Sequence, residues 1–169
     1  MAVIESQVRS VKDQSEVLIV KPPMEAHGSI GFGGCILTRL PAFTDSRGVL
    51  AVVERHFGLP FDVKRCFMVF GVPEGQHRGG HSLKHSYEVM IGVSGSTTLD
   101  VDDGETCWRV VLDDPTISVY VPIGVWSEQH TFSSDAVLVV LASKDYDANE
   151  FDTVRPRRNS DGSLPSAIR

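Results

Sequence analysis

Short valine-rich runs recur at close intervals along most of this chain, separated by Gly, Pro and Asp residues. Such runs, bounded by turn residues, are typical of β-strands, and Asp102-Asp103-Gly104 predicts a hairpin turn. No apolar stripe with helical spacing extends beyond about two turns. We therefore expect an all-β sandwich or barrel, with strands at residues 34–37, 49–54, 63–70, 88–93, 97–101, 108–112, 117–121 and 136–141.

The 169 residues, of which 41% are hydrophobic, are enough for one domain with a substantial core. We divide them into a leader at 1–34, a barrel at 35–153 and a flexible tail at 154–169. In the leader, Val17–Val20 could form a short strand, and Gly28–Gly34 is expected to be loop. The tail is expected to be solvated, although three basic residues could contact a phosphate: Arg155, Arg157 and Arg158.

The net charge and the apolar pattern limit the kinds of molecule that this chain is expected to bind. Charged residues make up 22% of the chain and the net charge is −6, which argues against nucleic acid because that partner favours a basic face. No apolar run approaches the roughly 20 residues that span a bilayer, and Met1–Arg9 lacks the pattern of a signal peptide. We therefore expect a cytoplasmic protein that does not bind membranes. The three cysteines form no metal-binding pattern and are expected to be reduced and mostly buried: Cys35, Cys66 and Cys107.

Two stretches resemble the opening and closing signatures of the cupins. Gly79–Glu88, followed by Gly95, has the spacing of the opening signature, and Pro122–Ser127 has that of the closing one. Leu83 and Ser127 stand where two of the four usual metal ligands, both histidines, belong. The resemblance implies a cupin-type jelly-roll barrel of antiparallel strands.

Loss of these two ligands bears on the choice of cofactor. Zinc and iron sites usually need three protein ligands, and the cupin frame supplies only His81 and Glu88. His85 or His130 could complete a site, but neither lies at the expected spacing. We therefore expect no metal and no other cofactor.

His81 is the first candidate for chemistry. If the strand after Gly80 is extended, His81, Leu83 and His85 share one face, although a bulge would change this. The inner face of a small barrel is where a ligand pocket forms, and an imidazole can exchange a proton near neutral pH. We interpret His81 as a general base; the alternative is a histidine that only makes a hydrogen bond in the core.

Three arginines lie in or beside strands and turns near this motif: Arg47, Arg65 and Arg78. Burying an unpaired guanidinium is costly, so each needs an anionic partner. A diphosphate suits the bidentate geometry of arginine, but internal pairing with Asp45, Glu54 or Asp62 is equally possible. Three aromatic residues could form a wall for a base or sugar, or could belong to the core: Tyr87, Tyr120 and Trp126.

The stretch from Leu40 to Asn149 resembles the WxcM-like sugar-nucleotide 3,4-ketoisomerases, small cupins that act on thymidine-diphosphate 4-keto-6-deoxyglucose. The resemblance rests on residues 45–48, 60–65, 78–82, 95–96, 102–104, 120–122, 125–128, 132–135 and 140–147. It implies a metal-free homodimer in which a pocket histidine removes a proton from the carbon beside the ketone and forms an enediol. His81 matches the first histidine of the family's motif, and Arg65 and Arg78 match its arginines.

The chain departs from that family at three places. Leu83 replaces the second histidine, Phe67-Met68 replaces a pair of tyrosines, and Ser127 replaces the histidine after tryptophan. Losing a general acid–base group typically reduces the rate by about a hundredfold to ten-thousandfold, so either another side chain carries part of the proton relay or the reaction is a different one. The candidates are His85, Tyr87, Glu88 and Ser127.

We therefore predict an isomerase of a nucleotide-linked 4-keto-6-deoxy sugar in deoxysugar biosynthesis. The alternatives are an epimerase on the same substrate class, a cupin that binds a nucleotide sugar without catalysis, and a metal-dependent cupin with an unusual ligand set. The predicted catalytic residues are His81, His85, Tyr87 and Glu88. The predicted substrate-binding residues are Arg47, Arg65, Arg78, Tyr120, Trp126 and Ser127.

Overall fold

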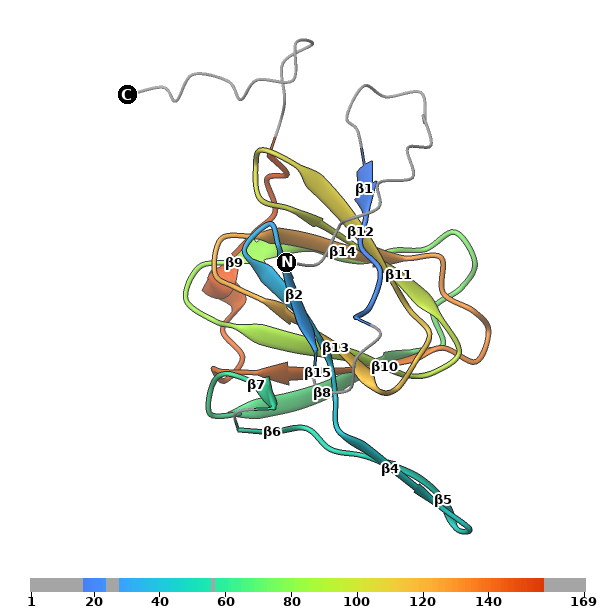
Figure 1. Ribbon diagram of the computed structural model, residues 1–169. Coiled ribbons are helices and arrows are strands. Elements are labelled where there is room, and N and C mark those ends of the chain that lie inside the picture. The colour runs from blue at the N-terminus through green and yellow to red at the C-terminus, as the bar shows by residue number, and fades with distance from the viewer. Residues whose placement is uncertain (1–16, 24–27, 56, 157–169) are drawn as a thin grey trace.

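The computed structural model describes residues 17–23, 28–55 and 57–156, and the main body of these residues is built on two six-stranded sheets (Figure 1). The predicted all-β jelly roll is confirmed. Its two sheets are not closed into a barrel, so the structure is open at the edges of the sheets. Each of the eight predicted runs overlaps a strand. The described residues contain no α-helix, and their one helical turn is the 3-10 segment η1 (Ala148–Glu150).

The first sheet carries strands from both ends of the described chain. Its pairs are antiparallel except that β1 runs parallel to β12. The hairpin predicted at Asp102-Asp103-Gly104 is confirmed, since it joins β11 to β12. In spatial order the strands are β1 (Val17–Ile19), β12 (Cys107–Leu112), β11 (Thr97–Asp102), β14 (Trp126–His130), β9 (Arg78–Leu83) and β16 (Phe151–Asp152).

The second sheet faces the first and is antiparallel throughout. Its strand order interleaves distant segments, as a jelly roll requires. In spatial order the strands are β2 (Ser29–Phe32), β3 (Cys35–Arg39), β13 (Ile117–Val121), β10 (Glu88–Ser94), β15 (Val137–Ala142) and β8 (Arg65–Phe70). The expectation of loop at Gly28–Gly34 is wrong for Ser29–Phe32, because this segment pairs with β3 through a turn at Gly33-Gly34.

Two small pairs of strands lie outside these sheets. The hairpin of β4 (Ala42–Asp45) and β5 (Gly48–Ala51) projects from the body as an arm (Figure 1). The pair β6 (Glu54–Arg55) and β7 (Gly58–Leu59) follows it. Leu59 of β7 and Phe61, two residues further on, pack with Val89 and Ile91 of β10 in a small cluster.

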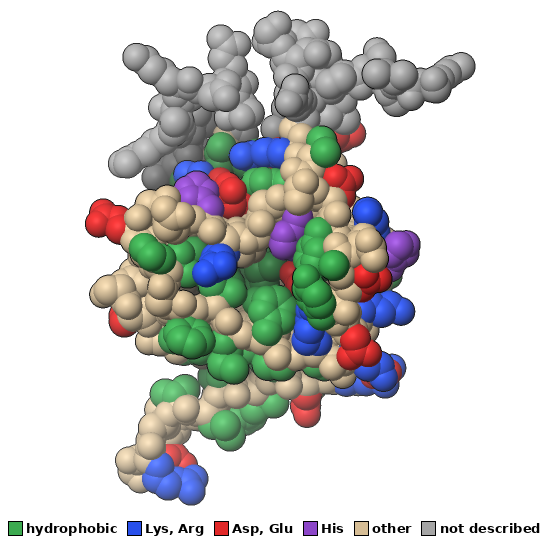
Figure 2. All heavy atoms as spheres, turned by 180° about the vertical axis from the view of Figure 1, so that it is seen from behind, with side chains coloured by type: hydrophobic (Ala, Val, Ile, Leu, Met, Phe, Trp, Pro, Cys, Tyr) green, Lys and Arg blue, Asp and Glu red, His purple; other side chains and the backbone are tan. Residues whose placement is uncertain are grey.

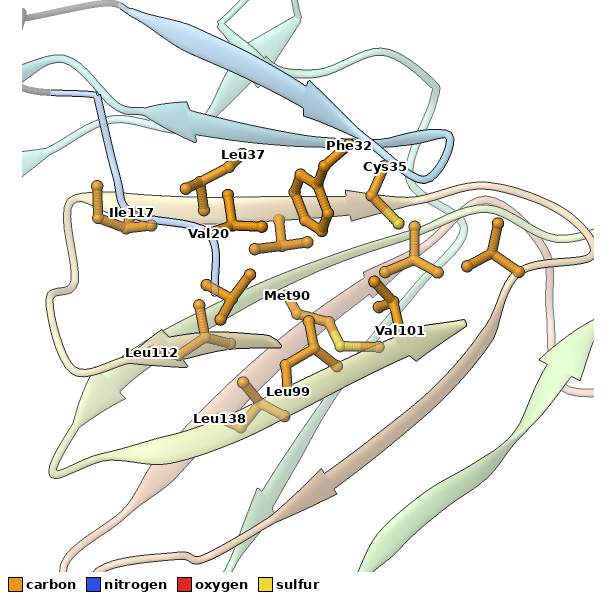
Figure 3. Close-up of a cluster of buried hydrophobic side chains, with 14 of the residues drawn as sticks. Val20, Phe32, Cys35, Leu37, Met90, Leu99, Val101, Leu112, Ile117 and Leu138 are labelled. Carbon is orange, nitrogen blue, oxygen red and sulfur yellow. The ribbon is translucent and has the colours of Figure 1, made fainter. Parts of the chain in front are cut away.

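The main core fills the space between the sheets (Figure 3). Leu99 and Val101 of β11 meet Met90 of β10 and Leu138 of β15 there, and all four side chains are buried. Alternate residues of β11 and of β15 face this core, as the twofold periodicity of a β-strand dictates. Burial of these apolar groups is the main force that holds the two sheets together.

The cysteines differ from one another in exposure. Cys35 and Cys107 are buried as predicted, but the expectation of burial is wrong for Cys66, which lies on the open face of the edge strand β8. Burial, with a smaller contribution from the charge of Asp103, raises the pKa of Cys35 to about 12. Its thiol is therefore a poor nucleophile near neutral pH, because the thiolate is the reactive form.

The described ends of the chain pack onto the first sheet. Arg155 places its guanidinium over the ring of Trp126, 4.4 Å from the centroid, and its Nε lies 3.6 Å from Asp102 Oδ2. This residue therefore has internal partners rather than the solvated environment that we predicted. Arg157 and Arg158 lie outside the described residues. Among the described residues, no helix has the length and apolarity needed to cross a membrane.

Candidate functional site

A cavity of about 480 Å³ opens between the two sheets, at the end where the main core stops. Strands β8, β10 and β15 form one wall, β9 and β14 form the other, and the segment after β15 adds two aromatic side chains. Figure 2 shows hydrophobic side chains gathered across the middle of one face, with basic and histidine side chains beside them. The lining residues are Arg65, Phe67, Val69, Arg78, Gly79, His81, Glu88, Met90, Gln129, Val140, Tyr146 and Phe151.

A local irregularity in β9 orients His81. In the pairing with β14, Ser127 lies opposite His81 but Glu128 lies opposite Gly79, so the register shifts by one residue at Gly80. Such a bulge re-aims the side chains beyond it. Gly79 has φ of 74°, and a Cβ there would lie 2.9 Å from the carbonyl oxygen of Ser127. A glycine at this position therefore allows the close approach of β14 that places His81 in the cavity wall.

The environment of His81 favours the neutral, basic form of its imidazole. Burial lowers the pKa of His81 below its usual value, and a hydrogen bond to the backbone of Gly79 opposes this only in part. The ring of Phe151 meets the imidazole edge-on, with centroids 4.6 Å apart. A neutral imidazole that borders a cavity can accept a proton from a bound molecule.

Glu88 approaches the same cavity from the opposite sheet. It is the first residue of β10 and only 4% exposed. Its Oε1 lies 3.9 Å from Nη2 of Arg65, which is too long for a hydrogen bond. Burial raises the pKa of Glu88 to about 7, and the positive charge of Arg65 offsets only part of that effect. This carboxyl can therefore carry a proton near neutral pH.

Two arginines give the cavity its positive charge. Arg65 in β8 lies over the rings of Phe67 and Tyr146, at 4.9 and 5.5 Å, and its buried Nε–H has no hydrogen-bond partner among the described residues. Arg78, at the start of β9, lines the cavity but is exposed, so it lies at the opening. A buried donor without an acceptor is costly, so Arg65 suits an oxygen of a bound ligand.

The rest of the lining is mostly apolar, with one polar residue that the sequence did not indicate. Gln129 of β14 is buried and its amide nitrogen contacts Met90 Sδ at 3.7 Å. Its strand has no apolar alternation, so only the register with β9 could have identified it. Phe67, Val69 and Val140 complete the wall of the second sheet.

The segment Ser143–Asp152, which we call the strap, supplies Tyr146 and Phe151 to the cavity. Glu150 holds it in place by accepting hydrogen bonds from the backbone N–H of His85 at 2.6 Å and from His85 Nδ1 at 3.2 Å. Lys84 Nζ adds a hydrogen bond to the carbonyl oxygen of Asn149 at 2.9 Å. The family resemblance reaches residue 147 of this segment, but no sequence pattern predicted that the strap would line the cavity.

His85 does not share a face with His81 as we expected, because β9 ends at Leu83 and a turn follows. Its exposed ring belongs to the strap contact and does not line the cavity. Ser127 is buried beside His81 in register but does not line the cavity either. Leu83 is also buried, opposite Phe151 of β16.

The remaining predicted site residues lie elsewhere. Arg47 is at the tip of the arm, with 88% of its side chain exposed, and is paired with Asp45. Tyr87 stacks with Phe61 and with Tyr120 in a separate aromatic group, and Tyr120 lines a smaller hollow of about 170 Å³. Trp126 is buried beneath Arg155, and its Nε1–H has no hydrogen-bond partner among the described residues.

The histidines considered as extra metal ligands have other partners. His85 contacts Glu150, and His130 Nε2 lies 3.2 Å from Asp100 Oδ2 on a strand pair of the first sheet. Across residues 17–23, 28–55 and 57–156, no group of three or more His, Cys, Asp or Glu side chains could hold a metal ion.

A family model described as FdtA: WxcM-like, C-terminal matches residues 33–155. A curated relative, the TDP-4-oxo-6-deoxy-alpha-D-glucose-3,4-oxoisomerase of Aneurinibacillus thermoaerophilus, is 38% identical over 107 residues, which cover 63% of this chain and 77% of the relative.

Two solved structures are similar along most of their length. The TDP-quinovose 3,4-ketoisomerase WlaRB of Campylobacter jejuni is 34% identical, with a TM-score of 0.68, over 71% of this chain and 92% of that one. The sugar 3,4-ketoisomerase QdtA of Thermoanaerobacterium thermosaccharolyticum, solved in complex with TDP, is 30% identical, with a TM-score of 0.67, over 75% of this chain and 89% of that one. The predicted family resemblance is confirmed.

Proposed function

This chain belongs to the FdtA family of WxcM-like proteins, and on that basis we propose that it is a 3,4-ketoisomerase of a nucleotide-linked 4-keto-6-deoxy sugar. The observation that carries the proposal is the position of His81, a neutral imidazole in the wall of a cavity that also contains two arginines. The cavity volume of about 480 Å³ lies within the range usual for small-molecule sites.

In the proposed reaction, His81 removes the proton from C3 of the sugar while the C4 carbonyl oxygen gains a proton. The electrons of the C3–H bond become the C3–C4 double bond of an enediol. The hydroxyl at C3 then loses its proton and becomes the ketone, while protonated His81 returns a proton to C4. The enzyme ends as it began, and no oxidant or reductant is consumed.

We propose that the two arginines bind the anionic parts of substrate and intermediate. Arg78, at the opening, suits a diphosphate, because a guanidinium offers paired donors. Arg65, deeper in the wall and with a free Nε–H among the described residues, suits a sugar oxygen that gains negative charge during the reaction. The TDP bound to the related QdtA supports thymidine diphosphate as the nucleotide. For His85, Tyr87, Tyr120 and Arg47 we propose no contact with substrate from within the same chain.

The test is solvent exchange at carbon. The protein is incubated in deuterium oxide with thymidine-diphosphate 4-keto-6-deoxyglucose, and the sugar protons are followed by NMR. We expect deuterium in the sugar ring together with conversion to the 3-keto isomer. His81→Asn should abolish both while TDP still binds, and His130→Asn, a matched change outside the cavity, should abolish neither.

Other outcomes would replace the proposal with one of its alternatives. Exchange with inversion at the same carbon, and no 3-keto product, would identify an epimerase. Tight TDP binding with no exchange would identify a binding protein. Loss of activity in a chelator, with recovery on adding metal, would contradict our prediction that no metal is needed.

We also propose that the protein is a homodimer. The arm exposes Phe43, Val49 and Leu50, which are 61%, 65% and 63% accessible, and the edge strand β8 exposes Met68 and Phe70. Large apolar side chains gathered on an edge strand and a projecting hairpin are typical of an interface between subunits. A second copy of the chain would cover both. The cytoplasmic location stays a prediction from the sequence.

A further inference from the structure

Moving a ketone between neighbouring carbons requires two kinds of proton transfer. One proton moves between C3 and C4, and a second moves between the two oxygens. A single imidazole that is occupied with the carbon-bound proton cannot serve the oxygens in the same step, so a second proton carrier is needed. In this chain Leu83, a side chain that cannot carry a proton, stands where the cupin frame has its second histidine.

Several polar side chains near the site fail this requirement. Ser127 does not line the cavity, and the ring of His85 is engaged with Glu150 in the strap. Gln129 lines the cavity, but an amide does not titrate. Tyr146 also lines it, yet its side chain is largely exposed at the opening.

Glu88 meets the requirement by position. It lines the cavity from β10 while His81 lines it from β9, so a flat sugar between the sheets would have one group on each side. No described residue donates a hydrogen bond to its carboxyl, and Arg65 remains 3.9 Å away. The carboxyl is therefore buried, directed to the cavity, and free to exchange a proton with a ligand.

We propose, on the premise that the protein is the ketoisomerase described above, that Glu88 is the acid–base group that moves the proton between the sugar oxygens. Neutral Glu88 donates its proton to the C4 carbonyl oxygen as His81 takes the proton from C3. The resulting carboxylate then takes the proton of the C3 hydroxyl as protonated His81 delivers its proton to C4. Both side chains return to their starting forms, so one proton circulates on each.

The proton affinities of the two groups fit these roles. Burial raises the pKa of Glu88 to about 7, so the carboxyl is partly protonated near neutral pH, while burial lowers the pKa of His81 and favours the neutral imidazole. The reaction needs Glu88 with its proton and His81 without one. Activity should therefore be bell-shaped in pH, with a rising limb from His81 and a falling limb near pH 7 from Glu88.

The experiment compares wild type with Glu88→Gln, which keeps the shape and hydrogen-bonding capacity of the side chain but cannot donate a carboxyl proton. Glu74→Gln is the matched control, because Glu74 is exposed in a turn outside the cavity. We expect E88Q to reduce kcat by about a hundredfold or more, with TDP affinity retained and the falling limb near pH 7 removed from the residual activity. Retained TDP affinity also reports that the variant is folded.

The possible outcomes distinguish a failure of the Glu88 assignment from a failure of the ketoisomerase proposal. If wild type and E88Q turn over at similar rates, or if E88Q keeps the falling limb, Glu88 is not the carrier and the ketoisomerase proposal stands. If wild type binds TDP but neither exchanges nor isomerises the sugar, both proposals are overturned. A slow E88Q without the falling limb, beside an active wild type and an unaffected E74Q, supports the assignment.

Discussion

At the scale of single residues, the proposed chemistry of the cavity rests on two side chains from opposite sheets, His81 in β9 and Glu88 in β10. Burial shifts the pKa of each in the direction that its proposed role requires: down for the base, His81, and up for the acid, Glu88. Arg65 lies next to Glu88 but at 3.9 Å, so its charge limits the rise in the pKa of the carboxyl without holding it ionised.

The raised pKa of Glu88 predicts a pH dependence of stability. Glu88 has a pKa of about 7 in the folded protein and 4.5 in the unfolded chain. Its contribution to the free energy of unfolding is therefore fully present below pH 4.5 and is lost as the pH rises through about 7. Glu88→Gln removes the ionisation. The free energy of unfolding of the variant minus that of wild type should therefore increase from pH 5 to pH 8, by up to about 3 kcal/mol.

Thermal or urea denaturation of both proteins at several pH values measures this difference. Glu74→Gln, an exposed change, should show no such trend. A gap between E88Q and wild type that is the same at pH 5 and pH 8 would mean that Glu88 titrates normally in the folded protein.

At this scale, part of the candidate site was predictable from the sequence. His81, Arg65, Arg78 and Glu88 were all predicted from the motif and its frame, and all line one cavity. Tyr87, Tyr120 and Trp126 were chosen by residue type, and they lie outside it because the face on which a strand residue points depends on register and bulges. No local pattern contains that information.

At the scale of elements, the bulge in β9 and the strap determine the shape of the site. The bulge turns His81 into the cavity, and the strap brings Phe151 against it. Each of the eight apolar runs predicted as strands overlaps a strand. Seven of them place side chains in or against the main core, whereas the run at 49–54 falls on the exposed arm. β14 was not predicted because it has the sequence Trp-Ser-Glu-Gln-His, in which no apolar residues alternate.

Gly79 should be sensitive to substitution. An alanine there would adopt a left-handed backbone conformation and would also place its Cβ 2.9 Å from a backbone oxygen of β14. We expect Gly79→Ala to destabilise the fold by about 1–3 kcal/mol and to reduce kcat, because His81 follows two residues later. Melting temperature and steady-state kinetics check this.

Gly71→Ala is the matched control. Gly71 has a similar φ of 63°, but a Cβ there would meet nothing within 4 Å. The Gly71→Ala variant should lose stability through backbone strain alone and should keep the kcat of wild type. Equal effects of the two alanines on kcat would show that the contact with β14 does not position His81.

The strap should govern substrate affinity. Glu150 accepts from the backbone and ring of His85, and these hydrogen bonds, together with one from the backbone of Ser86, outweigh burial and lower its pKa. Glu150→Gln weakens a charge-assisted contact, so we expect KM to rise by about threefold to tenfold with a smaller change in kcat. Hydrogen exchange of residues 143–152 should accelerate in parallel. An unchanged KM with faster exchange would show that the strap does not hold substrate.

At the scale of the whole molecule, two sheets pack over a common core and leave one end open for the cavity, while apolar surface remains uncovered on the arm and on β8. The sequence indicated the jelly roll through its short strands and turns. It could not indicate the arm, because Phe43, Val49 and Leu50 read locally like core residues although they are exposed in the single chain.

The uncovered surface predicts the behaviour of the protein in solution. Light scattering on a sizing column should give twice the mass of one chain for wild type. Leu50→Glu introduces a charge into the exposed apolar face of the arm and should shift the protein toward the monomer, since an unpaired charge is costly in an interface. A monomeric wild type, or a dimer unaffected by L50E, would rule out the arm as the contact between subunits.

The most direct test of the whole account is a crystal structure of the His81→Asn variant with thymidine-diphosphate 4-keto-6-deoxyglucose bound. We predict that the sugar ring lies in the cavity between the sheets, with C3 beside position 81 and the carboxyl of Glu88 within hydrogen-bond distance of the oxygens on C3 or C4. A sugar bound outside this cavity, with residue 81 out of reach of its ring carbons, would contradict the account.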